Sequence, residues 1–204
     1  MSVKWLLGID EVGRGPLAGP VAVGLVLVPI DMDWKRISGV TDSKKLSATK
    51  REQIAAQARQ LSEEGVLYYS VTMTSASVID KIGIVSSINK ALLRGLQQLT
   101  ERYTVTPEQV DLKLDGGLYA PKEWKYQETI IRGDAKEPII GLASIVAKVA
   151  RDRYMNRIAA REKYLPYDFS SHKGYGTKAH RAAVARHGLS DLHRYSYCKN
   201  IKLL

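Results

Sequence analysis

The feature that most constrains the fold is an unbroken apolar run over residues 21–29, Val-Ala-Val-Gly-Leu-Val-Leu-Val-Pro. The run is rich in β-branched residues and shows no polar alternation, which is typical of a strand that is buried on both faces. It is far shorter than the roughly 20 apolar residues that cross a membrane. We therefore expect a strand inside a sheet that is covered by helices, and no membrane span.

The hydrophobic period over the rest of the chain predicts further strands and helices. Residues 110–115 alternate, with Val110, Leu112 and Leu114 on one side. The expected strands are 4–12, 21–29, 66–74, 110–115 and 126–131, and the expected helices are 47–64, 84–102, 138–164 and 177–187. Either Ser47 or a capping box of Thr49 and Glu52 begins the first helix. This order predicts an α/β fold, a mixed five-stranded sheet flanked by helices and followed by a helical C-terminal region.

The positive charge is concentrated at one end of the chain. The net charge is +10 over 204 residues, of which +9 falls within residues 146–204 together with all four histidines. A one-sided basic segment favours an anionic polymer as partner, and the alternative is a solvated helical face. We expect a single domain over 1–204, with an α/β core over about 1–155 and a basic helical region over about 156–204.

Cysteine usage and the absence of a leader pattern limit the class of protein. Cys198 is the single cysteine, which excludes an internal disulfide and a cysteine-rich zinc module. No basic segment precedes a long apolar stretch with a small-residue cleavage site. These observations favour a cytoplasmic, globular protein.

Two adjacent acids, Asp10 and Glu11, end the otherwise apolar first strand. Two like charges about 4 Å apart repel by roughly 4 kcal/mol at an effective dielectric near 20. A positive partner is therefore required, and a divalent cation, Arg14 or a lysine would serve. The alternative is that Asp10 points inward to a lysine while Glu11 points to solvent.

Asp115 and Asp134 each follow a strand-like segment and lie beside glycines. Singly, each is typical of a turn residue. Strand-end acids can also converge at one edge of an open α/β sheet, where such folds place their sites. A set of oxygen ligands suits Mg²⁺ or Mn²⁺ and not zinc.

The glycine-rich segment after the acids does not match a nucleotide-binding loop. Gly13 and Gly15 are followed by prolines and a strand, unlike the dinucleotide fingerprint, and the chain has no P-loop. Their backbone N–H groups can approach a ligand closely because no Cβ intervenes. Tyr175 lies between glycines and beside Lys173 and Lys178, so we expect an exposed ring that can stack on a sugar or base.

Several blocks, in order and over about residues 7–197, resemble the ribonuclease HII family, the bacterial type 2 ribonucleases H. The blocks are residues 8–20, 42–46, 114–116, 133–136, 143–153 and 172–180. The resemblance implies a ribonuclease H-like fold with a metal site made by four acids that are both catalytic and metal-binding, Asp10, Glu11, Asp115 and Asp134. It implies two divalent ions, Mg²⁺ or Mn²⁺, with Asp10 as their bridging ligand. It also implies that Gly13, Arg14, Gly15 and Tyr175 read the ribonucleotide at an RNA–DNA junction, and that Ser43 and Lys44 contact the substrate.

The expected function is that of an endoribonuclease that hydrolyses the RNA strand of RNA–DNA hybrids. It would cut 5′ of a ribonucleotide at RNA–DNA junctions, including single ribonucleotides embedded in duplex DNA, and leave 5′-phosphate and 3′-hydroxyl ends. The alternatives are a non-enzymatic basic nucleic-acid-binding protein and a two-metal DNA phosphodiesterase. We expect a monomer that binds hybrid duplex and ribonucleotide-containing DNA, and binding to a replication clamp stays open.

The remaining polar residues have simpler interpretations. Asp152 lies four residues after Lys148, which favours an ion pair on a helix surface over a fifth metal ligand. The spacing of His172, His180, His187 and His193 does not fit a zinc site. We expect these histidines to contact phosphate, cap helices or lie in solvent.

Overall fold

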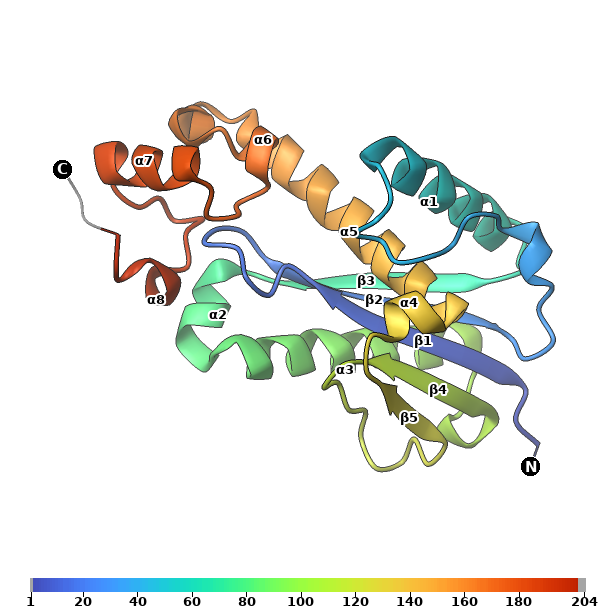
Figure 1. Cartoon of the computed structure of the whole chain (residues 1–204). Helices are drawn as coiled ribbons and strands as arrows, with labels where there is room; N and C mark the ends of the chain where they lie inside the picture. Colours follow the sequence, from blue (N-terminus) through green and yellow to red (C-terminus); the bar gives the residue numbers. More distant parts are fainter. Residues whose placement is uncertain (1, 202–204) are drawn as a thin grey trace.

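The computed structural model describes residues 2–201, and its centre is a mixed five-stranded sheet (Figure 1). The strand order is β3-β2-β1-β4-β5; β1 is antiparallel to β2 and parallel to β4. The strands are β1 (Trp5–Val12), β2 (Val21–Pro29), β3 (Tyr68–Thr74), β4 (Val110–Asp115) and β5 (Gln127–Ile130). The predicted sheet is confirmed, and the bounds of β2 and β4 agree with the prediction to the residue.

Helices cover both faces of the sheet (Figure 1). The α-helices are α1 (Ala48–Glu63), α2 (Ala76–Ile82), α3 (Ile84–Tyr103), α4 (Gly133–Lys136), α5 (Pro138–Ala159), α6 (Phe169–His172), α7 (Lys178–His187) and α8 (Tyr195–Cys198). Short 3-10 helices are η1 (Trp34–Arg36), η2 (Pro107–Gln109) and η3 (Glu162–Tyr167). Helix α3 packs on one face, and α1 and α5 pack on the other. No helix among residues 2–201 is long and apolar enough to cross a membrane.

The apolar run of β2 is explained by these two layers. Its odd-numbered residues, such as Val23 and Leu25, join the core under α3. Its even-numbered residues Val26 and Val28 join the core under α1 and α5. Because successive side chains of a strand point to opposite faces, a strand buried on both faces must be apolar throughout.

Helix α5 lies very close to the middle of the sheet. A Cβ atom on Gly8 would lie 2.5 Å from the carbonyl oxygen of Ile139, so the glycine permits the approach. Gly24 makes the same contact possible against the backbone at Ala143. This packing places the next turns of α5 beside the ends of β1 and β4.

Of the two predicted starts of α1, Ser47 is confirmed: its side chain accepts from the amide of Lys50 at 3.1 Å, so Thr49 and Glu52 do not form a capping box there. The predicted end of one helix was wrong, and one helix was missed. Helix α5 ends at Ala159 and not at residue 164, because the 3-10 helix η3 follows. Helix α2 was not predicted, and Gly83, with φ +79°, separates it from α3.

The loop between β1 and β2, residues 13–20, is held by the C-terminal helices (Figure 1). The amide of Leu17 donates to the carbonyl of Gly174 at 2.9 Å, and the amide of Arg194 donates to the carbonyl of Leu17 at 2.8 Å. Ala18 is buried in the hydrophobic cluster formed by η3, α6 and α7. The C-terminal region thus fixes a loop that follows directly after the paired acids of β1.

Candidate active site

Three acids meet where the parallel strands β1 and β4 end. Asp10 and Glu11 are near the end of β1, and Asp115 is the last residue of β4. Because Ile9 pairs with Leu114, the carboxyl groups that follow lie side by side. One oxygen from each of the three carboxylates lies within 4.8 Å of the others.

The electrostatics of this group call for a cation. Burial raises the pKa of Asp10 well above its ordinary value, and the carboxylates of Glu11, Asp115 and Asp134 raise it further. Burial also raises the pKa of Glu11, against the opposing effect of Arg14, whose Nη1 lies 3.1 Å from Oε1. The second oxygen, Oε2, is buried and has no hydrogen-bond partner among the described residues. An unpartnered carboxylate oxygen among three acids fits a divalent cation with oxygen ligands.

The alternative of a simple inward lysine does not hold. The ion pair of Lys44 is with Asp134, Nζ to Oδ2 at 3.4 Å, while Asp10 Oδ1 accepts from the amide of Glu11 at 2.8 Å. Glu11 is half-buried and does not point freely into solvent. Asp10 does lie buried, as that interpretation expected, but without an ion pair to any lysine among residues 2–201, and Glu11 is not turned to solvent.

Asp134 lies beside the three acids but in a different setting from the predicted one. It does not end a strand, because it is the second residue of the short helix α4. The residue that precedes α4, Arg132, has a left-handed backbone with φ 57°. Asp115 Oδ1 accepts from the amide of Gly133 at 2.6 Å, which ties α4 to the end of β4.

A pocket of about 270 Å³ opens over the acids. It gathers every residue predicted for the site except Asp134, and its walls include Asp10, Glu11, Gly13, Arg14, Gly15, Ser43, Lys44, Asp115 and Tyr175. Two wall residues, Ser144 and Lys148 of α5, were missed by the sequence analysis. Their spacing of four residues on one helix face, with Arg151 one turn further, was the available signal.

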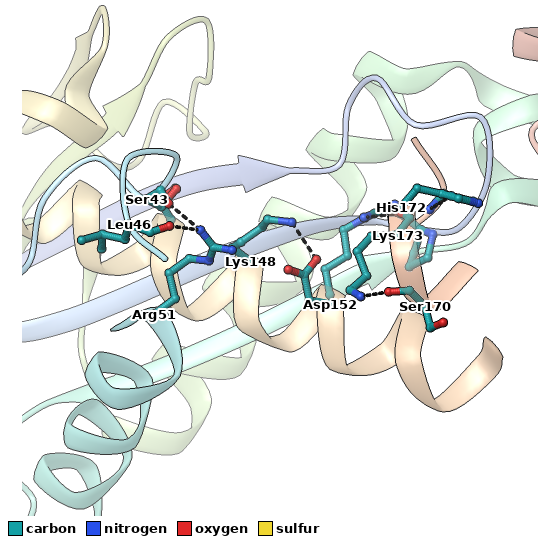
Figure 2. A network of polar contacts seen from close by, with 12 residues as sticks. Ser43, Leu46, Arg51, Lys148, Asp152, Ser170, His172 and Lys173 are labelled. Carbon is teal, nitrogen blue, oxygen red and sulfur yellow. Dashed lines mark hydrogen bonds and ion pairs between the residues drawn. The ribbon is translucent and has the colours of Figure 1, made fainter. Parts of the chain in front are cut away.

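The loop that carries Ser43 and Lys44 is anchored from behind by α1 (Figure 2). Arg51 Nη1 donates to the carbonyls of Ser43 at 2.9 Å and of Leu46 at 2.6 Å. The Ser43 hydroxyl is buried and lies 2.8 Å from the hydroxyl of Ser144. Ser43 therefore links the loop to α5, while Lys44 extends to the acids.

Figure 2 also shows the ion pair of Lys148 and Asp152 along α5. Lys148 Nζ lies 2.7 Å from Asp152 Oδ1. The predicted i, i+4 pair is confirmed, although both side chains are largely covered and do not lie on a freely solvated surface.

Tyr175 is exposed, as predicted, at 40% of its surface. Its ring lies near Lys148 Nζ, at 5.8 Å, and near the guanidinium of Arg151, at 5.7 Å. The predicted neighbours Lys173 and Lys178 do not make these contacts. A half-open ring with cations beside it at the rim of the pocket suits contact with an anionic ligand.

The histidine prediction was wrong for His180 and His193, which are buried and do not contact solvent. His193 Nδ1 accepts from the amide of Ser190 at 2.9 Å, so its Nε2 carries the proton and donates to His180 Nε2 at 3.1 Å. His180 Nδ1 then donates to the carbonyl of Tyr175 at 2.9 Å. Burial lowers the pKa of both imidazoles to about 4, which keeps the chain of neutral rings intact at neutral pH.

The other two histidines are less buried. His172 stacks on His180 with ring centroids 4.2 Å apart and contacts the carbonyl of Tyr167 at 2.8 Å. His187 is exposed at the end of α7, as one of the predicted options allowed. His172 thus packs beside the segment that carries Tyr175, since its Nδ1 also accepts from the amide of Gly174 at 3.2 Å.

Comparison with known proteins decides what kind of site this is. The family model described as Ribonuclease HII matches residues 7–200 of the chain. The chain belongs to the ribonuclease HII family. A ribonuclease HII from Caldicellulosiruptor bescii is 42% identical over 199 residues, which cover 97% of this chain and 88% of that protein. One from Bacillus anthracis is 42% identical and covers 96% of this chain and 69% of that protein.

Solved structures agree with the family assignment. The ribonuclease HII in a PCNA complex from Archaeoglobus fulgidus has a TM-score of 0.68 at 26% identity, with 93% of each chain covered. The chain is therefore a metal-dependent ribonuclease that acts on RNA–DNA hybrids, and its sheet and helices are those of the type 2 and type 3 ribonucleases H. Membership in this family rules out the non-enzymatic interpretation of the basic residues.

Proposed function

We propose that the enzyme cuts on the 5′ side of a ribonucleotide at an RNA–DNA junction, including a single ribonucleotide embedded in duplex DNA. The observation that carries this proposal is the open backbone at Gly15, in the wall of the pocket that holds the acids. RNA in a duplex differs from DNA by its 2′-hydroxyl, which both donates and accepts a hydrogen bond. To recognise the 2′-hydroxyl, the protein needs backbone atoms that can come within hydrogen-bond distance of it.

The two glycines of this loop are required for different reasons. Gly13 has φ +92°, and a Cβ there would collide with the side chain of Arg151, so the fold itself requires glycine. A Cβ on Gly15 would meet no atom within 4 Å, and its φ is not positive. Neither strain nor packing within the protein requires a glycine at position 15, and the open space there would let a ligand come close to the backbone, which supports the proposal.

Tyr175 would supply the second part of the specificity for a junction, which is recognition of the deoxynucleotide that follows the ribonucleotide. We place its ring against the sugar of the nucleotide that follows the ribonucleotide, where a deoxyribose fits and a 2′-hydroxyl would crowd. The carbonyl oxygen of Tyr175 accepts from His180 Nδ1 at 2.9 Å and from the amide of Thr177 at 2.8 Å. These two contacts hold the residue, and with it the ring, at the rim of the pocket. This arrangement favours a ribonucleotide that is followed by DNA.

The acids would hold the divalent ions. Asp10, Glu11, Asp115 and Asp134 would bind two Mg²⁺ or Mn²⁺ ions, which when bound activate water and neutralise charge on a phosphoryl group. Lys44, at 82% exposure of its side chain, reaches over Asp134 and can contact a phosphate. Ser43 would position this lysine through Ser144, and Arg14 would position Glu11. The products would carry a 5′-phosphate and a 3′-hydroxyl.

A gel assay on an end-labelled duplex with one ribonucleotide tests the proposal, with an all-DNA duplex as control and either Mg²⁺ or Mn²⁺. We expect a single cut 5′ of the ribonucleotide and none in the control. Tyr175→Ala and Gly15→Val should both lower the rate, whereas Tyr126→Ala, which removes another exposed ring at the far end of β5, should not. Equal cutting of the all-DNA duplex would favour a DNA phosphodiesterase and overturn the proposal.

A further inference from the structure

Two arginines, Arg151 and Arg194, are the largest fully buried side chains of the protein, each with 0% exposure. A buried guanidinium is expensive unless its donors are satisfied. Six hydrogen bonds from the two side chains go to backbone carbonyl oxygens, five of them in the loop of residues 13–20, and the ring of Tyr197 lies 5.2 Å from the guanidinium of Arg194. Two buried cations are thus placed directly behind the loop that borders the pocket.

Arg194 binds three carbonyls at once. Its Nη2 donates to Gly13 at 2.7 Å, its Nη1 to Arg14 at 2.9 Å and its Nε to Gly19 at 3.0 Å. The planar guanidinium presents donors in a fixed fork, so it sets the orientation of these peptide units and not merely their position.

The orientation of these carbonyls determines where two amides point. A trans peptide is planar, and its C=O and N–H point in opposite directions. The carbonyl of Gly13 shares its peptide with the N–H of Arg14, and the carbonyl of Arg14 shares its peptide with the N–H of Gly15. Since both carbonyls point inward to Arg194, both N–H groups point away from it.

These two amides are free to bind a ligand. Arg14 and Gly15 are exposed, and over residues 2–201 neither amide donates to a protein acceptor. A cation at the carbonyl end also polarises each peptide and strengthens its N–H as a donor. The guanidinium therefore orients and strengthens two donors that face the pocket.

We propose that Arg194 is a positioning residue for ribonucleotide recognition, acting through the peptides that present the N–H groups of Arg14 and Gly15 to the 2′-hydroxyl and its adjoining phosphate. The inference rests on the proposed function, since it explains how the reading amides of that site are held. Arg194 does not touch the substrate, and its effect is on selectivity for the ribonucleotide.

Arg151 provides a matched control. It is equally buried and also donates to three carbonyls, those of Pro20 at 2.8 Å, Lys173 at 3.0 Å and Ala18 at 3.2 Å, and its guanidinium lies 5.7 Å from the ring of Tyr175. None of these peptides supplies the amide of Arg14 or Gly15. Loss of Arg151 should make the loop of residues 13–20 and the segment that carries Tyr175 less well ordered. It should not specifically affect recognition of the 2′-hydroxyl.

The test compares binding of two duplexes, one with a single ribonucleotide and one all-DNA, by fluorescence anisotropy with Ca²⁺ in place of Mg²⁺. The wild type should prefer the ribonucleotide duplex. In Arg194→Lys and Arg194→Gln this preference should fall about tenfold, with all-DNA affinity changed less than about twofold, because a lysine or amide cannot satisfy three divergent carbonyls. Arg151→Lys should weaken both duplexes alike and keep the ratio.

The outcomes separate the inference from the proposed function. A wild type without preference for the ribonucleotide duplex overturns the proposed function. A wild type with preference, retained in folded Arg194 variants, overturns the inference alone. If neither Arg194 variant folds, the NMR chemical shifts of the amide protons are measured in the wild type. The amide shifts of Arg14 and Gly15 should change on addition of the ribonucleotide duplex and not on addition of the all-DNA duplex. If they respond equally to both, the inference is wrong.

Discussion

Replacing Asp10 with asparagine should make the metal-free protein more stable while it removes activity. Asp10 is buried, and the carboxylates of Glu11 and Asp115 lie beside it. Its Oδ1 accepts from the amide of Glu11 at 2.8 Å, a contact that an asparagine oxygen keeps. The substitution therefore removes a buried negative charge and keeps this backbone hydrogen bond, although the side chain of Ser144 also hydrogen-bonds the carboxylate.

The size of the effect follows from the separation of the charges. Two unit charges at 4.8 Å, the upper limit of the separation between these oxygens, repel by about 3.5 kcal/mol at an effective dielectric of 20. Glu11 and Asp115 reach solvent on one side, which screens the repulsion. We expect a net gain of about 1–2 kcal/mol in the free energy of unfolding, or roughly 2–8 °C in Tm for a chain of this size.

Thermal unfolding in the presence of a chelator, followed by titration with Mn²⁺ or Mg²⁺, measures this effect. The wild type should gain Tm on addition of the metal, and the Asp10→Asn variant should not, because ligand binding to the native state stabilises it in proportion to the logarithm of saturation. Asp111→Asn is the matched control on β4: this acid pairs with Lys113 at 3.3 Å, so its loss should leave Tm unchanged or lower. An Asp10→Asn variant that melts at or below the wild-type temperature without metal would refute the repulsion argument.

Three further predictions concern activity, salt and pH. Asp134→Asn should remove most hybrid cleavage under saturating Mg²⁺ with the fold intact by circular dichroism, and near wild-type turnover would remove this acid from the site. Duplex affinity, measured by anisotropy, should fall with salt at a log–log slope of about −0.9 per phosphate neutralised, because the segment after residue 145 carries a net charge of +9; a flat dependence would contradict that role. The pKa of His180 and of His193 is about 4, below the value near 6.5 of an unfolded histidine, so the unfolded state takes up protons first as the pH falls. Stability should begin to fall below about pH 7 and be lower by about 4 kcal/mol for the pair at pH 5, roughly 2 kcal/mol for each imidazole, as measured by urea unfolding, and the fall should be smaller in His180→Asn.

The strand-end acids were predictable because parallel pairing determines them. The sequence identified Asp10, Glu11 and Asp115 as strand-end acids that could converge, and the parallel pairing of β1 with β4, in which Ile9 faces Leu114, brings them together at one edge of the sheet. The same rule misplaced Asp134, because the left-handed backbone at Arg132 starts a short helix after β5. No residue type at that position signals such a turn.

The buried polar residues could not be predicted from local patterns. Arginine is rarely buried, so neither Arg151 nor Arg194 stands out in the sequence, and the carbonyls that accept from Arg194 lie as much as 181 residues away. His180 and His193 belong to different segments, and only tertiary packing shows that their nitrogens satisfy one another. Residue patterns predict which face of an element is apolar, but not which polar groups meet across elements.

The hydrogen bonds from Arg151 and Arg194 to the carbonyls of residues 13–20 also bear on the order in which parts of the molecule fold. Residues 1–115 contain β1 and β4, and with them Asp10, Glu11 and Asp115. The carbonyls of Gly13 and Arg14, in contrast, accept hydrogen bonds from Arg194, which lies 180 or more positions later in the chain. Closing so long a loop is slow, because non-local contacts form only after the chain entropy between them has been lost. A nascent chain that has passed β4 but not yet residue 194 would therefore contain Asp10, Glu11 and Asp115 without the guanidinium that orients the peptides of residues 13–15. We expect the orientation of these peptides to be set late in folding.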